Sequence, residues 1–213
     1  MHSRRLLWSA SQFLGTPFLL AAYGSRVFGA ANVPRRGSVL IVSNHQSYLD
    51  PLLLALGLKR ELTFMARRSL FRNRWFGMLI RALNAFPVTR SGSDAGALRE
   101  AVNRLKNGWA LVVFPEGTRT RDGSIGPFQH GASLIARRAS VPVVPAVLEG
   151  PFRAWPRRGG MRLERLSVAF GKALMPDEYT NLSREAFTRR LRETMLDMHE
   201  RLRERAMRAR MPG

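Results

Sequence analysis

The sequence contains no cysteine, which excludes disulfides, thiolate catalysis and cysteine-ligated metal sites. Histidine is scarce too: the chain has four, and no two lie close enough in the sequence to favour a zinc site. The Gly-Lys-Ser/Thr ending of a nucleotide-binding P-loop is missing, and so is the Gly-x-Ser-x-Gly turn of a serine hydrolase. These absences argue against a zinc enzyme, a P-loop nucleotide-binding protein and a serine hydrolase with this turn.

Acidic residues are also few, and this gives the chain a large positive charge. It has 15 acidic against 35 basic residues and a formal net charge of +20 at pH 7. Only three of the basic residues are lysines, which leaves 32 arginines. Such an excess predicts an anionic partner, namely phosphate groups, an acidic lipid surface or nucleic acid. The basic residues are dispersed and no aromatic–basic recognition motif is present, so nucleic acid is the less favoured of these partners.

Only the N-terminus resembles a targeting segment. An uncharged stretch runs from Leu6 to Ser25 after Arg4 and Arg5, but polar residues dilute it and Pro17 interrupts it. We predict that residues 1–31 form two short helices in or on the cytoplasmic face of the cell membrane, as a peripheral attachment or an N-terminal anchor. The alternative is an amphipathic helix that packs on the protein itself.

The remaining residues, 32–213, show the pattern of one α/β domain, in which short apolar runs alternate with helical spacing. The predicted strands are residues 39–42, 62–66, 85–90, 110–114, 141–147 and 166–170. The predicted helices are residues 51–57, 70–83, 98–105, 131–139 and 187–202. The continuous apolar run at 110–114 is typical of a strand that helices cover on both faces.

A candidate catalytic pair follows the first of these strands. His45 comes just after the strand, where α/β proteins usually place their chemistry, and Asp50 lies at the start of the next helix. A loop that folds back would let the Asp50 carboxylate accept the Nδ1–H of His45 and leave Nε2 as a base. On spacing alone, Asp50 could equally be a helix cap and His45 a polar residue leaving a strand.

Two further polar motifs end predicted strands, so we expect them at the same edge of the sheet. Arg90 ends one strand, and Pro115-Glu116-Gly117-Thr118-Arg119 follows another. An arginine fork suits a phosphate, and glycine lets the backbone approach an anion closely. Taken singly, Arg90 could be a solvated surface charge and residues 117–119 an ordinary turn.

Together these motifs resemble the blocks of the glycerolipid acyltransferase family. Asn44 to Asp50 matches its Asn-His-x-x-x-x-Asp box, Phe86 to Arg90 is similar to the second block, and Phe114 to Arg119 matches the third. Val141 to Pro145 resembles the fourth, with Pro145 in the usual proline position. The resemblance implies a glycerolipid acyltransferase-like α/β sandwich, with a mixed sheet flanked by helices.

The resemblance also implies an activity. Family members of this kind move a fatty acyl group from acyl-CoA or acyl-carrier protein to the free hydroxyl of 1-acyl-sn-glycerol 3-phosphate, which gives phosphatidic acid. It implies His45 as general base and Asp50 as the group that orients it, with no metal or other cofactor. The remaining motif residues would bind the acceptor, namely Arg90, Glu116, Gly117, Thr118, Arg119 and Pro145. Besides lysophosphatidate and an acyl thioester, an anionic membrane surface is an expected partner, and specific nucleic-acid binding is not expected.

The sequence departs from the family pattern after the third block. Family members commonly have Phe-Lys-x-Gly there, whereas this chain has Gln129 in place of the lysine, with His130 or Arg121 as substitutes. An alternative acceptor is glycerol 3-phosphate or another lysolipid, and the alternative from another class is a basic nucleic-acid-binding protein.

Overall fold

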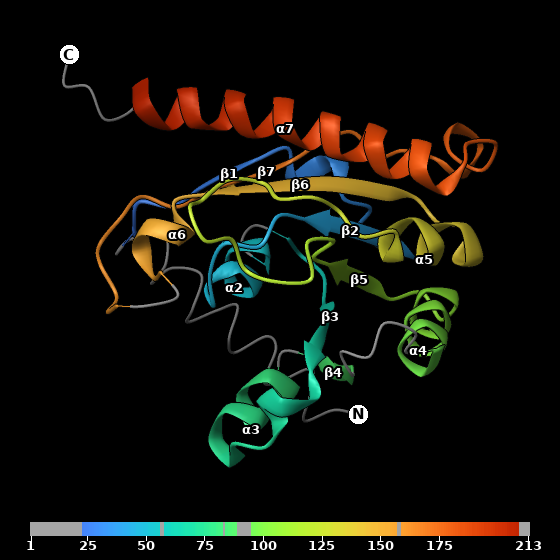
Figure 1. Cartoon of the computed structure of the whole chain (residues 1–213), viewed down its shortest axis with the longest axis horizontal. Coiled ribbons are helices and arrows are strands. Elements are labelled where there is room, and N and C mark those ends of the chain that lie inside the picture. The colour runs from blue at the N-terminus through green and yellow to red at the C-terminus, as the bar shows by residue number, and fades with distance from the viewer. Residues whose placement is uncertain (1–22, 56–57, 83, 89–94, 157–158, 209–213) are drawn as a thin grey trace.

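The computed structural model describes residues 23–55, 58–82, 84–88, 95–156 and 159–208, and it has a seven-stranded sheet between helices (Figure 1). The strands are β1 (Arg26–Phe28), β2 (Val39–Ser43), β3 (Leu62–Arg67), β4 (Ala85–Val88), β5 (Ala110–Val113), β6 (Val143–Glu149) and β7 (Ser167–Phe170). The helices are α2 (Asp50–Ala55), α3 (Arg74–Ala82), α4 (Ala95–Lys106), α5 (Gly131–Ala139), α6 (Pro151–Ala154) and α7 (Arg184–Arg208). Short 3₁₀ turns are η1 (Ala30–Asn32), η2 (Arg68–Phe71) and η3 (Pro176–Glu178).

The sheet is mixed, as the sequence predicts, and its order is β1-β7-β6-β2-β5-β3-β4. The strands from β6 to β4 pair in parallel, β7 is antiparallel to β6, and β1 is parallel to β7. Every residue of β2, β5 and β6 is buried, since these central strands have neighbours on both sides and helices on both faces. The predicted α/β fold is therefore confirmed.

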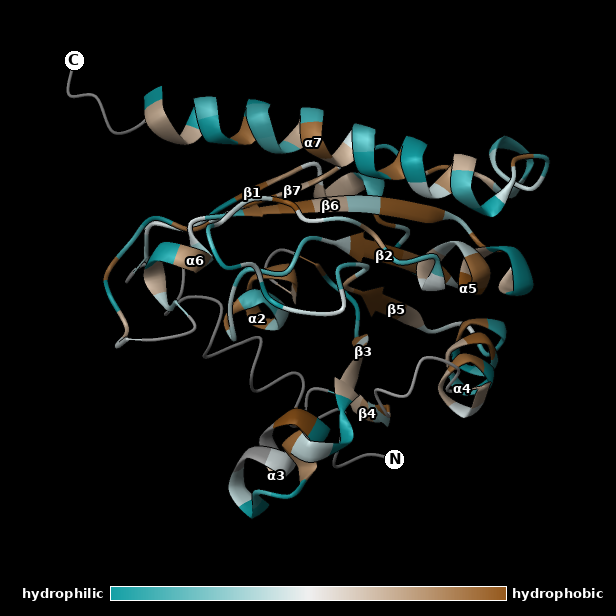
Figure 2. Cartoon of the chain, viewed as in Figure 1, coloured by the Kyte–Doolittle hydropathy of each residue, from teal (hydrophilic) through white to brown (hydrophobic). Residues whose placement is uncertain are grey.

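Two apolar clusters fill the space above and below the sheet. Alternate residues of the central strands face α4, α5 and α7 on one side, where Leu105, Ile135 and Leu191 are buried. The other alternate residues face α2 and α6, where Leu53 and Leu54 are fully buried. Figure 2 shows the apolar strands inside and a largely hydrophilic outer surface on α7. The helices cover both faces of the sheet and leave the strand ends for the connecting loops.

Three segments differ from the prediction. The predicted helix 70–83 is divided: η2 ends at Phe71, and α3 begins only at Arg74. The short helix α6 was not predicted. Residues 26–28, which we assigned to the membrane segment, form β1 and pair with β7 at the edge of the sheet. Residues 1–22 lie outside the described residues, so the N-terminal helices and the division of the chain at residue 31 stay predictions.

Within the described part of the chain, no helix is both long and apolar enough to cross a bilayer.

Candidate active site

The loop after β2 places His45 and Asp50 together. Nδ1 of His45 lies 2.7 Å from Oδ2 of Asp50, and the Asp50 side chain is fully buried. The same oxygen accepts the backbone N–H groups of Gln46 at 2.6 Å and Ser47 at 2.9 Å. Asp50 therefore does not cap α2 as an N-cap would, because its carboxylate points back into the loop and holds it closed around the imidazole.

Neighbouring polar side chains fix this loop to the rest of the protein. The Asn44 amide accepts the N–H of Leu148 at 2.8 Å and donates to its carbonyl at 3.1 Å, which continues the β2–β6 pairing beyond the strand. The Ser47 hydroxyl donates to the carbonyl of Trp155 at 2.9 Å. Asn44 and Ser47 are both buried, so these hydrogen bonds act where water does not compete.

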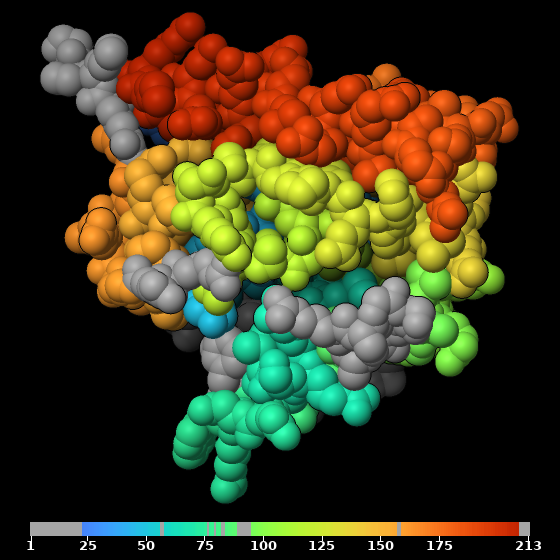
Figure 3. Space-filling model, in the orientation of Figure 1, coloured from blue at the N-terminus to red at the C-terminus, as the bar shows by residue number. Residues whose placement is uncertain are grey.

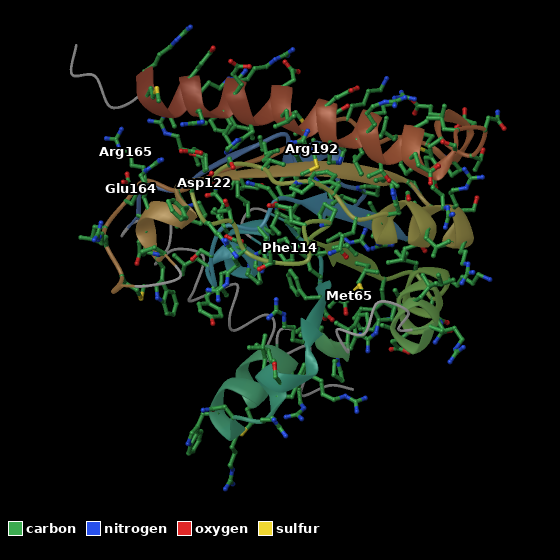
Figure 4. The ribbon with its side chains drawn as sticks, in the orientation of Figure 1. Met65, Phe114, Asp122, Glu164, Arg165 and Arg192 are labelled. Atoms are coloured by element: carbon green, nitrogen blue, oxygen red, sulfur yellow. The ribbon has the colours of Figure 1, made fainter. Side chains whose placement is uncertain are left out.

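His45 is positioned from below by the segment that follows β5. Its ring stacks on Phe114 with centroids 4.1 Å apart and the planes 17° from parallel. Phe114 lies near the middle of the molecule, just beyond β5 (Figure 4). The imidazole is about one-quarter exposed, and Nε2 has no hydrogen-bond partner among the described residues. The stack and the Asp50 contact thus orient the ring and leave one nitrogen for a reactant.

Glu116 joins the same loop through the backbone. One carboxylate oxygen accepts the N–H of His45 at 3.0 Å, and the other accepts the N–H of Gly126 at 3.1 Å. Burial raises the pKa of Glu116, although these backbone donors and the charge of His45 act in the opposite direction. The carboxylate connects the β2 loop to the segment that precedes α5.

The residues after Glu116 form a turn with two arginines beside it. Gly117 has φ of 67°, a conformation that favours glycine, and a Cβ there would come within 2.8 Å of the Gln129 amide nitrogen. The Arg119 guanidinium lies over the Tyr48 ring at 3.7 Å, and its Nη1 is buried with no hydrogen-bond partner among the described residues. Arg67, at the end of β3, donates to the Gly117 carbonyl at 3.5 Å. A concentration of positive charge thus borders the turn.

A second loop, residues 120–126, is hydrogen-bonded to the loop that carries His45. Hydrogen bonds from the Ser124 hydroxyl and N–H, and from Thr120, lower the pKa of Asp122 to about 2, so this carboxylate stays charged. Arg192 of α7 donates to the carbonyls of Gly126 and Ile125. Figure 4 shows Asp122 and Arg192 on the α7 side of Phe114. The loop is held by α7, the longest helix that the structure describes.

The structure brings together His45, Asp50, Glu116, Gly117, Thr118 and Arg119 at the edge of the sheet where β2, β3 and β5 end. Pro145 does not join them. It is buried within β6, in register with Val42, and its ring lies 2.9 Å from where a Cβ on Gly171 would be. Arg90 lies outside the described residues. Among the described residues, no three histidine, aspartate or glutamate side chains converge as a metal site requires.

Sequence reasoning missed three of these neighbours. Phe114 was treated only as part of a motif and Tyr48 as a spacer between His45 and Asp50, and Arg67 lay just beyond the predicted strand 62–66. Arg67 carried a usable signal, because it ends an apolar strand as Arg90 does. The stacking of Phe114 and Tyr48 depends on the path of two loops, which residue spacing does not define.

Similar proteins identify the family of this chain. A model of the Acyltransferase family matches residues 24–149, more than half of the chain. The chain belongs to the acyltransferase family. It is 31% identical over 176 residues to the 1-acyl-sn-glycerol-3-phosphate acyltransferase of Bacillus subtilis, which covers 80% of this chain and 87% of that protein.

Two further relatives carry similar names. A probable 1-acyl-sn-glycerol-3-phosphate acyltransferase of Mycoplasma pneumoniae is 39% identical over 127 residues, which are 56% of this chain and 47% of that protein. The crystal structure of the 1-acyl-sn-glycerophosphate acyltransferase PlsC from Thermotoga maritima superposes with a TM-score of 0.78 at 28% sequence identity. That match covers 94% of this acyltransferase and 82% of the PlsC chain.

Proposed function

We propose that this acyltransferase moves a fatty acyl group from a thioester to the free hydroxyl of 1-acyl-sn-glycerol 3-phosphate, which yields phosphatidic acid. The observation that carries the proposal is the 2.7 Å contact between His45 and the buried Asp50, at the strand edge that also holds Arg119. We assign the acceptor from the names of the relatives, which contain 1-acyl-sn-glycerol-3-phosphate or 1-acyl-sn-glycerophosphate. The donor is acyl-CoA or an acyl-carrier protein, since each presents the same thioester.

His45 would act as a general base. An alcohol is a weak nucleophile at neutral pH, and a base within hydrogen-bond reach removes its proton as the oxygen attacks. Nε2 of His45 would take that proton while the acceptor oxygen bonds to the thioester carbonyl carbon. The C–S bond of the resulting tetrahedral intermediate then breaks, and the thiolate leaves with the proton that His45 held. Asp50 accepts the Nδ1–H throughout and stabilises the imidazolium that forms.

The acceptor phosphate would bind at the turn after Glu116. Arg119 offers a buried Nη1 without a hydrogen-bond partner among the described residues, and Arg67 donates to the Gly117 carbonyl. A guanidinium fork can hold two phosphate oxygens at once, and Gly117 and Thr118 are exposed enough to approach them. In this arrangement Arg67 and Arg119 provide the positive charge that the phosphate requires. Arg90 is a further predicted ligand of the phosphate.

Glu116 would chiefly position the base. Both of its oxygens accept backbone N–H groups, one of which belongs to His45. The Glu116 carboxylate therefore helps to fix the position of His45 relative to the Phe114 ring, and it holds the 120–126 loop near His45. The predicted contacts of Glu116 and Pro145 with the acceptor stay predictions.

The proposed reaction needs no metal or other cofactor. A thiolate is a good leaving group, so the thioester requires no Lewis acid to react with an activated alcohol. The acceptor and the product are lipids, so we place the enzyme on the cytoplasmic face of the membrane, with residues 1–22 and the positive charge as its means of attachment.

The direct test is product analysis with competing acceptors. The purified protein is incubated with an acyl-CoA and equal amounts of lysophosphatidate, glycerol 3-phosphate and lysophosphatidylcholine, and the lipids are analysed by mass spectrometry. We expect phosphatidic acid to dominate. Acylated glycerol 3-phosphate or phosphatidylcholine as the main product would reassign the acceptor. A gel shift with DNA at physiological salt, in the absence of any acyl transfer, would favour the nucleic-acid alternative.

A further inference from the structure

The η2–α3 segment, residues 68–82, stands away from the rest of the molecule. It follows β3 and precedes β4, and α3 packs on η2 and β4. Figures 1 and 3 show it as a lobe that projects from the body below β3 and β4. Gly77 packs so closely on η2 that a Cβ there would lie 3.0 Å from the Phe71 carbonyl oxygen. The side of α3 that carries Gly77 and Ile80 is therefore the one turned toward the protein.

The opposite side of α3 combines large apolar side chains with arginines. Trp75 is 74% exposed and Met78 is 53% exposed, and they share one side of the helix with Arg74 at 100° per residue, whereas the Arg81 guanidinium lies over the Phe71 ring of η2. Single exposed apolar residues are normal on protein surfaces, but a tryptophan and a methionine beside an arginine on one helix side are not scattered. This composition matches helices that lie in a bilayer interface, with an apolar strip below and arginines reaching up to the headgroups.

The charge around α3 is of one sign only. Between Glu61 and Asp94 the sequence contains six arginines and no acidic residue. Four of the arginines in the described part, Arg68, Arg72, Arg74 and Arg81, are exposed. By contrast, α7 mixes acids and arginines on its exposed surface, as soluble proteins usually do. The exposed surface of α3 is complementary to negative charge.

This surface lies next to the candidate active site. β3 runs parallel to β5, so both strands end at the same edge of the sheet. Arg67, the last residue of β3, donates to the Gly117 carbonyl, and the chain continues directly into η2 and then α3. A lipid surface that touches α3 would therefore lie beside the edge of the sheet where the acceptor hydroxyl must arrive.

We infer that the Trp75–Met78 side of α3 binds the surface of an anionic lipid bilayer, as an attachment separate from the N-terminal segment. The inference rests on the proposed function only in that the acceptor and product are membrane lipids. Trp75 and Met78 enter the interface, while Arg74 contacts lipid phosphates. The two attachments would fix the orientation of the protein on the bilayer. Residues 1–22 attach the chain, and α3 turns the end of β3 toward the bilayer.

A matched pair of double variants tests the inference on the full chain. Arg74→Gln/Met78→Ala alters α3, and Arg203→Gln/Met207→Ala removes the same residue types at the same helical spacing from exposed positions of α7. Binding is measured by sedimentation with vesicles of phosphatidylethanolamine and phosphatidylglycerol. One arginine near an anionic surface changes partition about fivefold, and a partly inserted methionine adds to this. We expect about tenfold weaker binding for the α3 variant and unchanged binding for the α7 variant.

A fluorescent probe tests contact directly, which the absence of cysteine makes simple. Met78→Cys and Met207→Cys are each labelled with an environment-sensitive dye. Anionic vesicles should shift the emission of the dye at position 78 to the blue and leave that at position 207 unchanged. Either equal sedimentation of the two double variants or no vesicle-dependent shift at position 78 overturns the inference. If the emission of the dye at position 78 shifts to the blue without lipid as protein concentration rises, this surface binds a second copy of the chain. That result also overturns the inference.

These measurements separate the inference from the proposed function. Both assays read binding, so they succeed or fail whether or not acyl transfer occurs. With detergent-dispersed lysophosphatidate, the α3 variant should retain the activity of the unsubstituted protein, because α3 contributes no group to the reaction. Vesicle binding with no turnover on any acceptor would refute the function and leave the inference standing.

Discussion

Asp50 is the residue on which the proposed chemistry most depends. Its Oδ2 accepts one hydrogen bond from the His45 ring and two from the backbone of Gln46 and Ser47. The spacing of His45 and Asp50 permits the pairing, but it permits a helix cap equally well. Only the closed loop decides between them, and the loop conformation depends on Asn44 and Ser47, whose partners lie more than 100 residues away in the sequence.

Asp50→Asn should lower kcat on the order of a hundredfold or more while KM changes little. The neutral amide keeps the size of the side chain but no longer stabilises the imidazolium, and its NH₂ group competes with the donors that Asp50 accepts. Steady-state kinetics with lysophosphatidate measures the effect, and circular dichroism checks the fold. Retained kcat in a folded variant would mean that Asp50 only shapes the loop.

Arg119→Lys should mainly raise KM for lysophosphatidate, on the order of tenfold, with a smaller loss of kcat. Lysine keeps the charge but loses the planar fork, and it stacks less well on Tyr48. A control is the KM for the acyl donor, which should stay unchanged. A rise in donor KM instead would assign Arg119 to the thioester substrate.

At the scale of elements, the sequence predicted the interior of the sheet better than its edges. The runs at 39–42 and 110–114 are continuous and apolar, so their burial on both faces could be inferred directly. β1 could not, because a three-residue strand with mixed polarity has no periodicity, and only its pairing with β7 makes it a strand. The break between η2 and α3 could not be predicted, because the apolar residues in 70–83 keep helical spacing across this short irregular turn.

Glu149 connects β6 to two helices and provides an element-scale prediction. It accepts hydrogen bonds from His199 of α7 at 2.9 Å and Arg153 of α6 at 2.8 Å, and Arg153 also pairs with Glu164. Burial by itself would raise the pKa of Glu149, but hydrogen bonds and charge from His199 and Arg153 outweigh it and hold the pKa below its ordinary value. The contribution to stability is therefore present above pH of about 4.3 and is lost as pH falls through the folded-state pKa.

Glu149→Gln should lower the free energy of unfolding by about 2 kcal/mol at neutral pH, which is roughly 5 °C in Tm for a chain of this size. The difference in Tm between the two proteins should shrink as pH falls through the lowered folded-state pKa of Glu149, where the unsubstituted protein gains a proton. Thermal unfolding at a series of pH values measures it. A Tm difference that is independent of pH would show that packing, and not charge, accounts for the loss.

The whole molecule combines a large positive charge with a site at one edge of a sheet. Composition alone predicted that the partner carries negative charge, and the motifs predicted most of the residues of the candidate site. Composition could not distinguish lipid from nucleic acid, because phosphate is common to both. The position of α3 beside the candidate active site was also beyond the sequence, since it depends on β3 lying next to β5 in the sheet.

Deletion of residues 1–22 should weaken sedimentation with anionic vesicles several-fold, and high salt should weaken it further. The deletion removes the predicted apolar attachment but leaves β1 and its pairing with β7 in place. The circular dichroism spectrum of the truncated protein serves as the control for folding. Undiminished binding at low salt would locate membrane attachment elsewhere in the chain.

Free-thiol release is the most direct test of the central claim. The protein has no cysteine, so a thiol reagent detects only the CoA that leaves the donor. Purified protein is mixed with an acyl-CoA and lysophosphatidate in detergent micelles, with His45→Ala measured in parallel. We predict thiol release that requires lysophosphatidate and falls by at least about a hundredfold in His45→Ala. Lysophosphatidate-dependent release that persists at the full rate in His45→Ala would contradict the account, because the base would then be another group.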